Sequence, residues 1–156
     1  MFTSKQALDE LILETFRFHG LLIAAGDALT RDLGLSSARW QVLGAVGKSE
    51  VAPSLSAIAR TMGLSRQAVR RVVNELEAEG MVETKANPAN RRLRLVFLTA
   101  AGRSAHDKAN AKQVPWAERL AEGIVAESLL TAAKVMRDIR QQLEANASTQ
   151  SKHHEE

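Results

Sequence analysis

The side chains best suited to recognition chemistry lie near the middle of the chain, at the spacing of a helix. At about 100° per residue, a helix over about 65–79 gathers three guanidinium and two amide groups on one side: Arg66, Gln67, Arg70, Arg71 and Asn74. Guanidinium groups pair with guanine edges and phosphate, and amides pair with adenine. This face holds no carboxylate before Glu77. The pattern predicts contact with double-stranded DNA, with Ser65 and Arg66 on phosphate and the others in the groove.

The opposite side of this helix is apolar, so the helix can pack on a core through Val69, Val72, Val73 and Leu76. Ser65 is placed to cap the helix N-terminus, and Gly80 is placed to end the helix. A shorter helix over 56–62 precedes it, with a turn at Gly63 and Leu64. Two short helices joined by a tight turn that contains glycine are typical of a helix-turn-helix, whose second helix enters the major groove.

An isolated basic helix is more often an ordinary solvated surface, and the segment after Gly80 decides between the two interpretations. Two aliphatic and β-branched runs, 81–85 and 93–98, bracket a basic, turn-rich segment over 87–92. They predict a β-hairpin, one face of which can pack while charge stays near the tip. A helix-turn-helix followed by such a hairpin is a winged helix. A basic tip can reach a neighbouring minor groove, whose negative potential attracts arginine, and the predicted wing contacts are Arg91, Arg92 and Arg94.

Positive charge is concentrated in this part of the chain. The 156 residues carry a net charge of +3, and 45% of them are apolar. Residues 60–103 hold nine lysines and arginines against four glutamates, whereas the remainder holds twelve against fourteen acidic residues. The basic segment therefore supplies a sequence-independent attraction to phosphate. The length and the apolar content suit one domain that buries a core and keeps an assembly surface.

Four segments of the chain resemble the MarR (multiple antibiotic resistance regulator) family of winged-helix regulators: 33–43, 55–63, 69–82 and 98–102. The sharpest match is at the wing. The family has Asp-x-Arg, five residues and Leu-Thr, and this chain has Asn90-Arg91-Arg92, five residues and Leu98-Thr99. In the family the aspartate braces the wing arginine, whereas Asn90 offers a carbonyl acceptor without the charge. The resemblance implies a wing, and the substitution leaves its rigidity open.

The expected fold is mainly α with a small β-wing, arranged as a single MarR-like domain over 1–146. The winged helix-turn-helix is expected over about 34–102. Helices for dimerisation are expected on either side of it, over about 4–33 and 100–145. The polar tail over 147–156 is expected to be disordered.

The flanking helices carry more apolar residues than one core face needs. Thr3 or Ser4 can cap the first of them, and Pro115 should kink or divide the helical segment after the wing. The resemblance implies that these helices interlock with those of a second copy in a twofold homodimer; the alternative is that they pack only on their own domain. A dimer would place its recognition helices in successive major grooves about 34 Å apart, which predicts a pseudo-palindromic operator.

The resemblance also implies a ligand-responsive repressor that releases its operator when a small aromatic or phenolic effector binds between the dimerisation helices and the reading head. The candidate pocket residues are His19, Arg39, Trp40 and Trp116. Trp40 can instead belong to the core, His19 can be a structural residue, and Arg39 can lie on the surface or contact phosphate. A second class of function is a winged-helix module that contacts an acidic protein partner and does not read DNA sequence.

Other chemistry finds no support in the sequence. There is no cysteine, which excludes disulfides and thiolate metal sites within the chain. The four histidines lack the spacing of a metal site, and His153 and His154 are expected to be solvated in the tail. No Gly-rich phosphate loop and no Gly-x-Ser-x-Gly motif occurs, so we expect no enzyme, metal or cofactor. No leader and no apolar run of roughly 18 residues is present, which predicts a cytoplasmic protein without a membrane partner.

Overall fold

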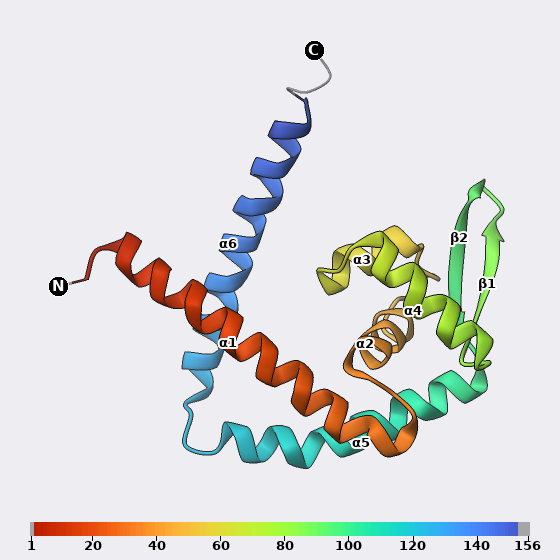
Figure 1. Ribbon diagram of the computed structural model, residues 1–156, viewed down its shortest axis with the longest axis horizontal. Helices are drawn as coiled ribbons and strands as arrows, with labels where there is room; N and C mark the ends of the chain where they lie inside the picture. The colour runs from red at the N-terminus through yellow and green to blue at the C-terminus, as the bar shows by residue number, and fades with distance from the viewer. Residues whose placement is uncertain (1, 153–156) are drawn as a thin grey trace. The chain divides into compact units, whose positions relative to one another are not determined.

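The structure is a computed structural model that describes residues 2–152, with side chains described through residue 147. In this part of the chain it contains six α-helices, one short 3-10 helix and one two-stranded antiparallel sheet (Figure 1). This confirms the expected fold, which is mainly α with a small β-wing. In chain order, the elements are α1 Ser4–Thr30, η1 Arg31–Leu33, α2 Ser37–Gly47, α3 Leu55–Met62, α4 Arg66–Ala78, β1 Val82–Asn87, β2 Asn90–Leu98, α5 Ala100–Ala121 and α6 Ala126–Lys152.

The chain divides into two compact units, Met1–Pro115 and Trp116–Glu156. The helix α5 crosses this division, because it runs through Pro115 without a break and ends at Ala121. Of the two outcomes expected at this proline, division of the helix does not occur. The prediction of one domain over 1–146 stays a prediction.

The last helix is longer than the sequence suggested. We expected it to end near residue 145, but α6 continues to Lys152. The first part of the predicted disordered tail, 147–152, is therefore helical. The remainder of that tail, with His153 and His154, lies outside the described residues.

The core of the first unit lies where α2, α3 and α4 meet the base of the hairpin formed by β1 and β2 (Figure 1). The hairpin contributes Val82 and Val96, which are both buried. Trp40 of α2 is half-buried and packs against this core. Burial of each aliphatic side chain is worth about 1.5–3 kcal/mol, so this cluster fixes how the recognition helix sits. The four apolar residues predicted to face the core from α4 are all buried: Val69, Val72, Val73 and Leu76.

Local side-chain caps explain where the helices begin. Thr3 caps α1 and forms a capping box with Gln6, and Ser54 accepts a hydrogen bond from the Ala57 N–H at the start of α3. Ser65 caps α4 in the same way, as predicted, through the N–H of Ala68. Such caps satisfy backbone donors that have no partner within the helix.

Two glycines close the helices of the helix-turn-helix. Gly63 has φ of 63° after α3, and Gly80 has φ of 71° after α4. Residues with a Cβ rarely adopt this left-handed conformation, whereas glycine does so without steric cost. The predicted turn and the predicted end of the recognition helix are both confirmed.

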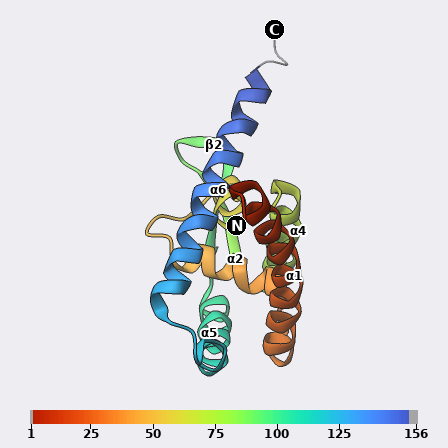
Figure 2. The same cartoon turned by 90° about the vertical axis from the view of Figure 1, so that its left-hand side faces the viewer.

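The wing is a hairpin with a tighter turn than expected. Asn87 pairs with Asn90 across a two-residue turn at Pro88 and Ala89, where we expected the turn to extend over 87–92. The register shifts between Ala86 and Asn87, which places the residues 91–93 of β2 beside the irregularity. The tip of the hairpin stands clear of α2, α3 and α4 in two views a quarter turn apart (Figure 1, Figure 2).

The base of the wing is fastened to the helices on both sides of it. The Val96 N–H donates to the Pro53 carbonyl at 2.9 Å, just before α3. The Thr99 N–H donates to the Met81 carbonyl at 3.1 Å, and the Thr99 hydroxyl donates to the Gly80 carbonyl at 2.6 Å. The same hydroxyl accepts from the Gly102 N–H in the first turn of α5. Thr99 therefore joins the two ends of the wing and caps the next helix.

The C-terminal half of α1 is held to α2, and the 3-10 helix η1 that follows it is held to α5. Ser37, at the start of α2, donates its N–H to Asp27 and its hydroxyl to the carbonyl of Ile23, both at 2.7 Å. Lys112 of α5 forms an ion pair with Asp32 in η1. The hydrogen bond from Lys112 holds the pKa of Asp32 below its usual value. This ion pair is exposed, so it contributes little to stability.

Candidate nucleic-acid interface

The polar side of α4 is free to meet a partner. All six residues predicted to contact DNA from this helix and its cap are exposed: Ser65, Arg66, Gln67, Arg70, Arg71 and Asn74. Among the described residues, none of the three arginines forms a salt bridge. Their guanidinium groups therefore remain available to phosphates and base edges.

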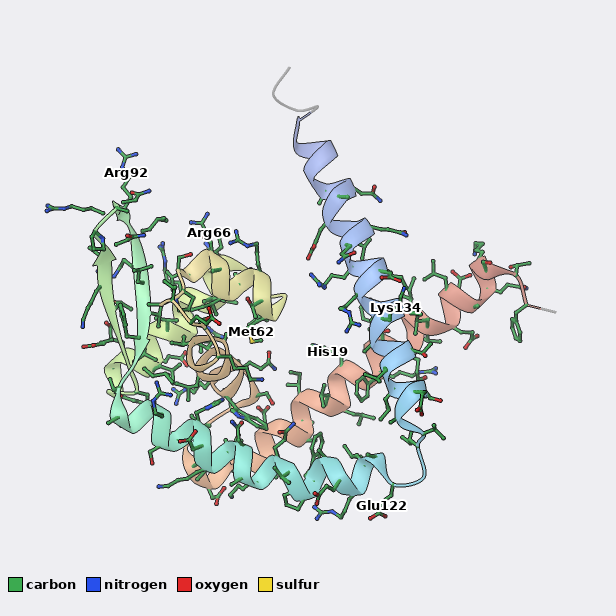
Figure 3. All side chains as sticks on the ribbon, turned by 180° about the vertical axis from the view of Figure 1, so that it is seen from behind. His19, Met62, Arg66, Arg92, Glu122 and Lys134 are labelled. Carbon is green, nitrogen blue, oxygen red and sulfur yellow. The ribbon has the colours of Figure 1, made fainter. Side chains whose placement is uncertain are left out.

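A hollow of about 300 Å³ lies between α4 and the wing. Arginines line it from both elements, and the two that are labelled in Figure 3, Arg66 at the start of α4 and Arg92 near the hairpin tip, extend to the same side. An adjoining hollow is lined by Gln67 together with Arg66 and Arg70. Of the predicted DNA contacts, five line the larger hollow: Arg66, Arg70, Asn74, Arg92 and Arg94.

The structure adds two serines to this surface and leaves two arginines outside the hollow. Ser54 and Ser56, at the start of α3, line the hollow beside the arginines. Sequence reasoning missed both, because they precede the recognition helix by about ten residues, although the cap position of Ser54 was a usable signal. Arg71 and Arg91 are exposed but do not line the hollow.

Asn90 has a different role from the one predicted for it. Its side-chain carbonyl accepts a hydrogen bond from the backbone N–H of Arg92 at 3.1 Å. In the same way, Asn87 accepts from the N–H of Ala89 at 3.0 Å. These are local turn contacts of the kind that asparagine favours. Asn90 therefore shapes the backbone of the tip, whereas the resemblance implied that this position braces a guanidinium group.

Arg94 is engaged inside the wing. Its Nε donates to the Thr84 hydroxyl at 3.1 Å, and its Nη2 donates to the Thr84 carbonyl at 3.2 Å and again to the hydroxyl. We had predicted Arg94 as a DNA contact on the same terms as Arg91 and Arg92. The structure instead uses its guanidinium group to cross the hairpin from β2 to β1.

Arg39 is engaged in the same manner between two helices. Its guanidinium group lies 3.3 Å from a Glu75 carboxylate oxygen and 2.8 Å from one of Glu79, and it donates to the carbonyl of Gly34. Its side chain is only 20% exposed to solvent. Arg39 therefore fastens α2 to the C-terminal half of the recognition helix. It lines neither the hollow between α4 and the wing nor the cavity beside Trp40, and its assignment to an effector pocket stays a prediction.

A second cavity, of about 470 Å³, lies between α2, α3 and α5. Trp40 lines it and donates its indole N–H to Asn110 at 3.0 Å. The Asn110 amide nitrogen in turn lies 3.3 Å from a ring nitrogen of His106, which is buried. Lys48 stands on the same lining. The cavity therefore offers an indole ring, a short polar chain and one cation.

Only one of the four predicted pocket residues lines this cavity. Trp40 does, whereas His19 is an exposed residue of α1 (Figure 3) and Trp116 is half-buried in the second unit. Sequence reasoning missed His106 and Asn110. Both come from α5, more than sixty residues after Trp40, and no local pattern links helices so far apart in the chain.

Comparison with known proteins identifies this arrangement. Residues 33–93 match the family model described as MarR family. Over 114 residues the chain is 33% identical to the uncharacterized protein Rv2011c of Mycobacterium tuberculosis, covering 73% of this chain and 78% of that protein. The chain belongs to the MarR family. It is a DNA-binding transcriptional regulator with a winged helix, as the sequence predicted.

Two further relatives of this MarR-family protein have names that state a property. One is the transcriptional activatory protein BadR of Rhodopseudomonas palustris, which is 30% identical over 97 residues, 61% of this chain and 55% of BadR. The other is the crystal structure of CouR from Rhodococcus jostii RHA1, bound to p-coumaroyl-CoA. It has a TM-score of 0.66 and 29% identity, over 81% of this chain and 86% of CouR.

The helices over residues 2–152 of this MarR-family protein do not include a candidate membrane span. Across the described residues, no helix combines the length and the apolar character that are needed to cross a bilayer.

Proposed function

We propose that this regulator is a homodimer that represses transcription by binding a pseudo-palindromic operator, and that a small aromatic or phenolic molecule releases it. The observation that carries the proposal is the hollow between α4 and the wing, where four arginines of two elements line one concave surface. Such a surface suits a duplex whose major groove receives α4 while the wing follows the backbone to the next groove. Each arginine that meets a phosphate displaces a counterion, so binding should depend on salt.

Exposed apolar side chains support the proposed dimer. Phe16 and Leu21 of α1 are each 72% exposed to solvent, and Leu130 of α6 is 69% exposed. Further large apolar residues are exposed on α1, and others follow on the end of α5 and on α6. A monomer rarely leaves so many apolar side chains in water. We therefore favour a second copy of the chain as their partner over packing on the same domain.

The sign of regulation follows from where the operator lies. Most members of the family block a promoter that they overlap, which is why we propose repression. The name of BadR states activation, and activation uses the same protein–DNA contacts at a different position. The contacts in the hollow therefore support DNA binding, and the position of the operator relative to the promoter tests the sign.

The cavity beside Trp40 supports the proposed effector. Its volume of about 470 Å³ falls within the range of about 300–1,000 Å³ that is usual for small-molecule sites. The ring of Trp40 can stack on an aromatic ligand, and Lys48 can pair with an acidic group. Residues of α2, α3 and α5 line the cavity. A ligand that fits one spacing of these helices better than another would shift the operator affinity.

Selection of duplexes from a random-sequence pool tests the proposed operator. We expect the recovered sites to contain two inverted half-sites about one helical turn, 34–36 Å, apart. Binding should weaken steeply between 50 and 200 mM salt, on the order of 10²-fold or more for a dimer with several phosphate contacts. If the selection recovers unrelated sequences, and if the protein binds them no more tightly than random duplex, this result would contradict sequence-specific binding.

Tryptophan fluorescence tests the proposed effector site. The chain has two tryptophans, so Trp116→Phe leaves Trp40 as the sole reporter. We expect p-coumarate or benzoate to change the Trp40 emission and to release the selected operator. Lys48→Met should weaken this binding about tenfold, because it removes one charge-assisted contact. Lys108→Met, on an exposed part of α5 outside the cavity, is the control, and equal losses in both variants would contradict the site.

A further inference from the structure

Three polar residues join the recognition helix to the wing. Glu77 of α4 accepts two hydrogen bonds from Thr84 of β1, one from its N–H at 2.9 Å and one from its hydroxyl at 2.8 Å. Arg94 of β2 then donates to the same hydroxyl and to the Thr84 carbonyl. These contacts connect three of the four elements that line the hollow between α4 and the wing; the fourth is α3.

The hydrogen-bonding capacity of threonine explains the order of the three residues. A hydroxyl has one proton to donate and two lone pairs that accept. The proton of Thr84 is directed to the Glu77 carboxylate, which leaves the lone pairs for the Arg94 guanidinium group. Bonds to ionised groups are roughly twice as strong as bonds between neutral groups. The single hydroxyl therefore links an anion on the helix to a cation on the far strand.

The remaining wing arginines depend on this link for their position. Arg91 and Arg92 are exposed, and the described residues offer their guanidinium groups no hydrogen bond, whereas Arg94 uses its own within the hairpin. At the tip, Asn90 orders only the backbone. The direction of the tip relative to α4 is therefore set by the fastening at the base of the wing and by the contacts of Thr84.

We propose that Glu77, Thr84 and Arg94 form a strut that holds the wing at one angle to the recognition helix. They are positioning residues for the DNA contacts of Arg91 and Arg92, and this role rests on the proposed operator binding. The strut also explains why Glu77, an acidic residue, lines a hollow that is proposed to face DNA. A carboxylate at that place repels phosphate, and the repulsion is offset when the carboxylate aligns the groups that bind phosphate.

Two substitutions at Thr84 separate the strut from other effects. Thr84→Val removes the hydroxyl, keeps the shape and the β-branched character, and changes no charge. Thr84→Ser keeps the hydroxyl and serves as the matched control. Because the chain has no cysteine, cysteines introduced at Ala78 and Ala89, both exposed, can carry spin labels without interference. A urea titration of each variant checks that the fold is retained.

The first readout needs no DNA. Labelled subunits are diluted with unlabelled ones, so that only the distance within one subunit is measured. Double electron–electron resonance should then give a narrow distance distribution between α4 and the wing tip in the parent protein and in Thr84→Ser. Thr84→Val should broaden it. An equally narrow distribution in Thr84→Val would overturn the strut.

The second readout compares a selected operator with and without the base pairs that flank its half-sites. The parent and Thr84→Ser should gain affinity from the flanks, and Thr84→Val should lose about tenfold on the long duplex only, as expected for one or two lost wing contacts. Higher affinity in Thr84→Val would show that Arg94 is released to contact DNA, which overturns the proposal. If the parent selects no duplex, the proposed operator binding fails, while the distance distributions still decide the strut.

Discussion

Replacing Arg70 and Arg71 together with alanine should lower the affinity for the selected operator at least about 100-fold, because each lost guanidinium contact is worth about 1–3 kcal/mol and a dimer loses it twice. Both side chains are exposed on α4, and Arg70 lines the hollow that faces the wing. Stability should change by less than about 0.5 kcal/mol, as is usual for exposed positions without buried partners. Fluorescence polarisation at several salt concentrations measures the affinity and the salt slope together.

A matched double variant removes the same charge elsewhere. Arg119→Ala with Arg137→Ala takes two exposed arginines from residues of the second unit, and its operator affinity should stay within about threefold of the parent, since neither side chain belongs to α4 or to the wing. Unchanged DNA binding in the Arg70 and Arg71 variant would favour the alternative function, a winged-helix module that contacts an acidic protein.

Replacing Gly102 with alanine should destabilise the protein by about 3 kcal/mol or more, the range of severe overpacking. A Cβ at this position would lie 1.9 Å from the carbonyl oxygen of Met81. That oxygen belongs to the backbone and already accepts the Thr99 N–H, so it cannot rotate away as a side chain would. The chain must separate α5 from the base of the wing. Thermal unfolding should report a lower Tm by about 6–12 °C, at 2–4 °C per kcal/mol for a chain of this size.

Gly20 provides the comparison for this change. It lies within α1, and a Cβ there would meet nothing within 4 Å. Gly20→Ala should therefore be neutral or stabilising by up to about 1 kcal/mol, because alanine favours the helix. Both variants must be compared at one protein concentration, since dimerisation would add to the measured stability. If the two variants have equal Tm values, the junction at Gly102 accommodates a methyl group without loss of stability, and the prediction is wrong.

Local features of the fold could be predicted from the sequence. The packing side of α4 followed from the spacing of its valines, and both ends of that helix followed from Ser65 and Gly80. These signals act within a few residues, where helical periodicity and capping are decided. The wing was predicted in the same way, from two β-prone runs around a basic turn.

The roles of individual arginines could not be predicted. Arg39 and Arg94 look like Arg70 and Arg71 in sequence, and each was a candidate for binding a ligand or DNA. Their partners, Glu79 and Thr84, lie forty and ten residues away, so only the tertiary fold reveals them. For the same reason, only Trp40 of the four predicted pocket residues lines the cavity, while His106 was considered only as a metal ligand.

The junction at Gly102 also bears on how the operator is released. Gly102 and His106 are four residues apart in α5 and so share one side of that helix; one lies against the base of the wing, and the other lines the cavity. The recognition helix, in contrast, is fastened to α2 through Arg39. The base of the wing is also fastened just before α3, through the Pro53 carbonyl. All three helices that line the cavity therefore adjoin one of the parts that are proposed to read DNA. A ligand that changes the spacing of these helices is therefore expected to shift the recognition helix and the wing together, because the contacts of Thr84 also join these two parts to each other.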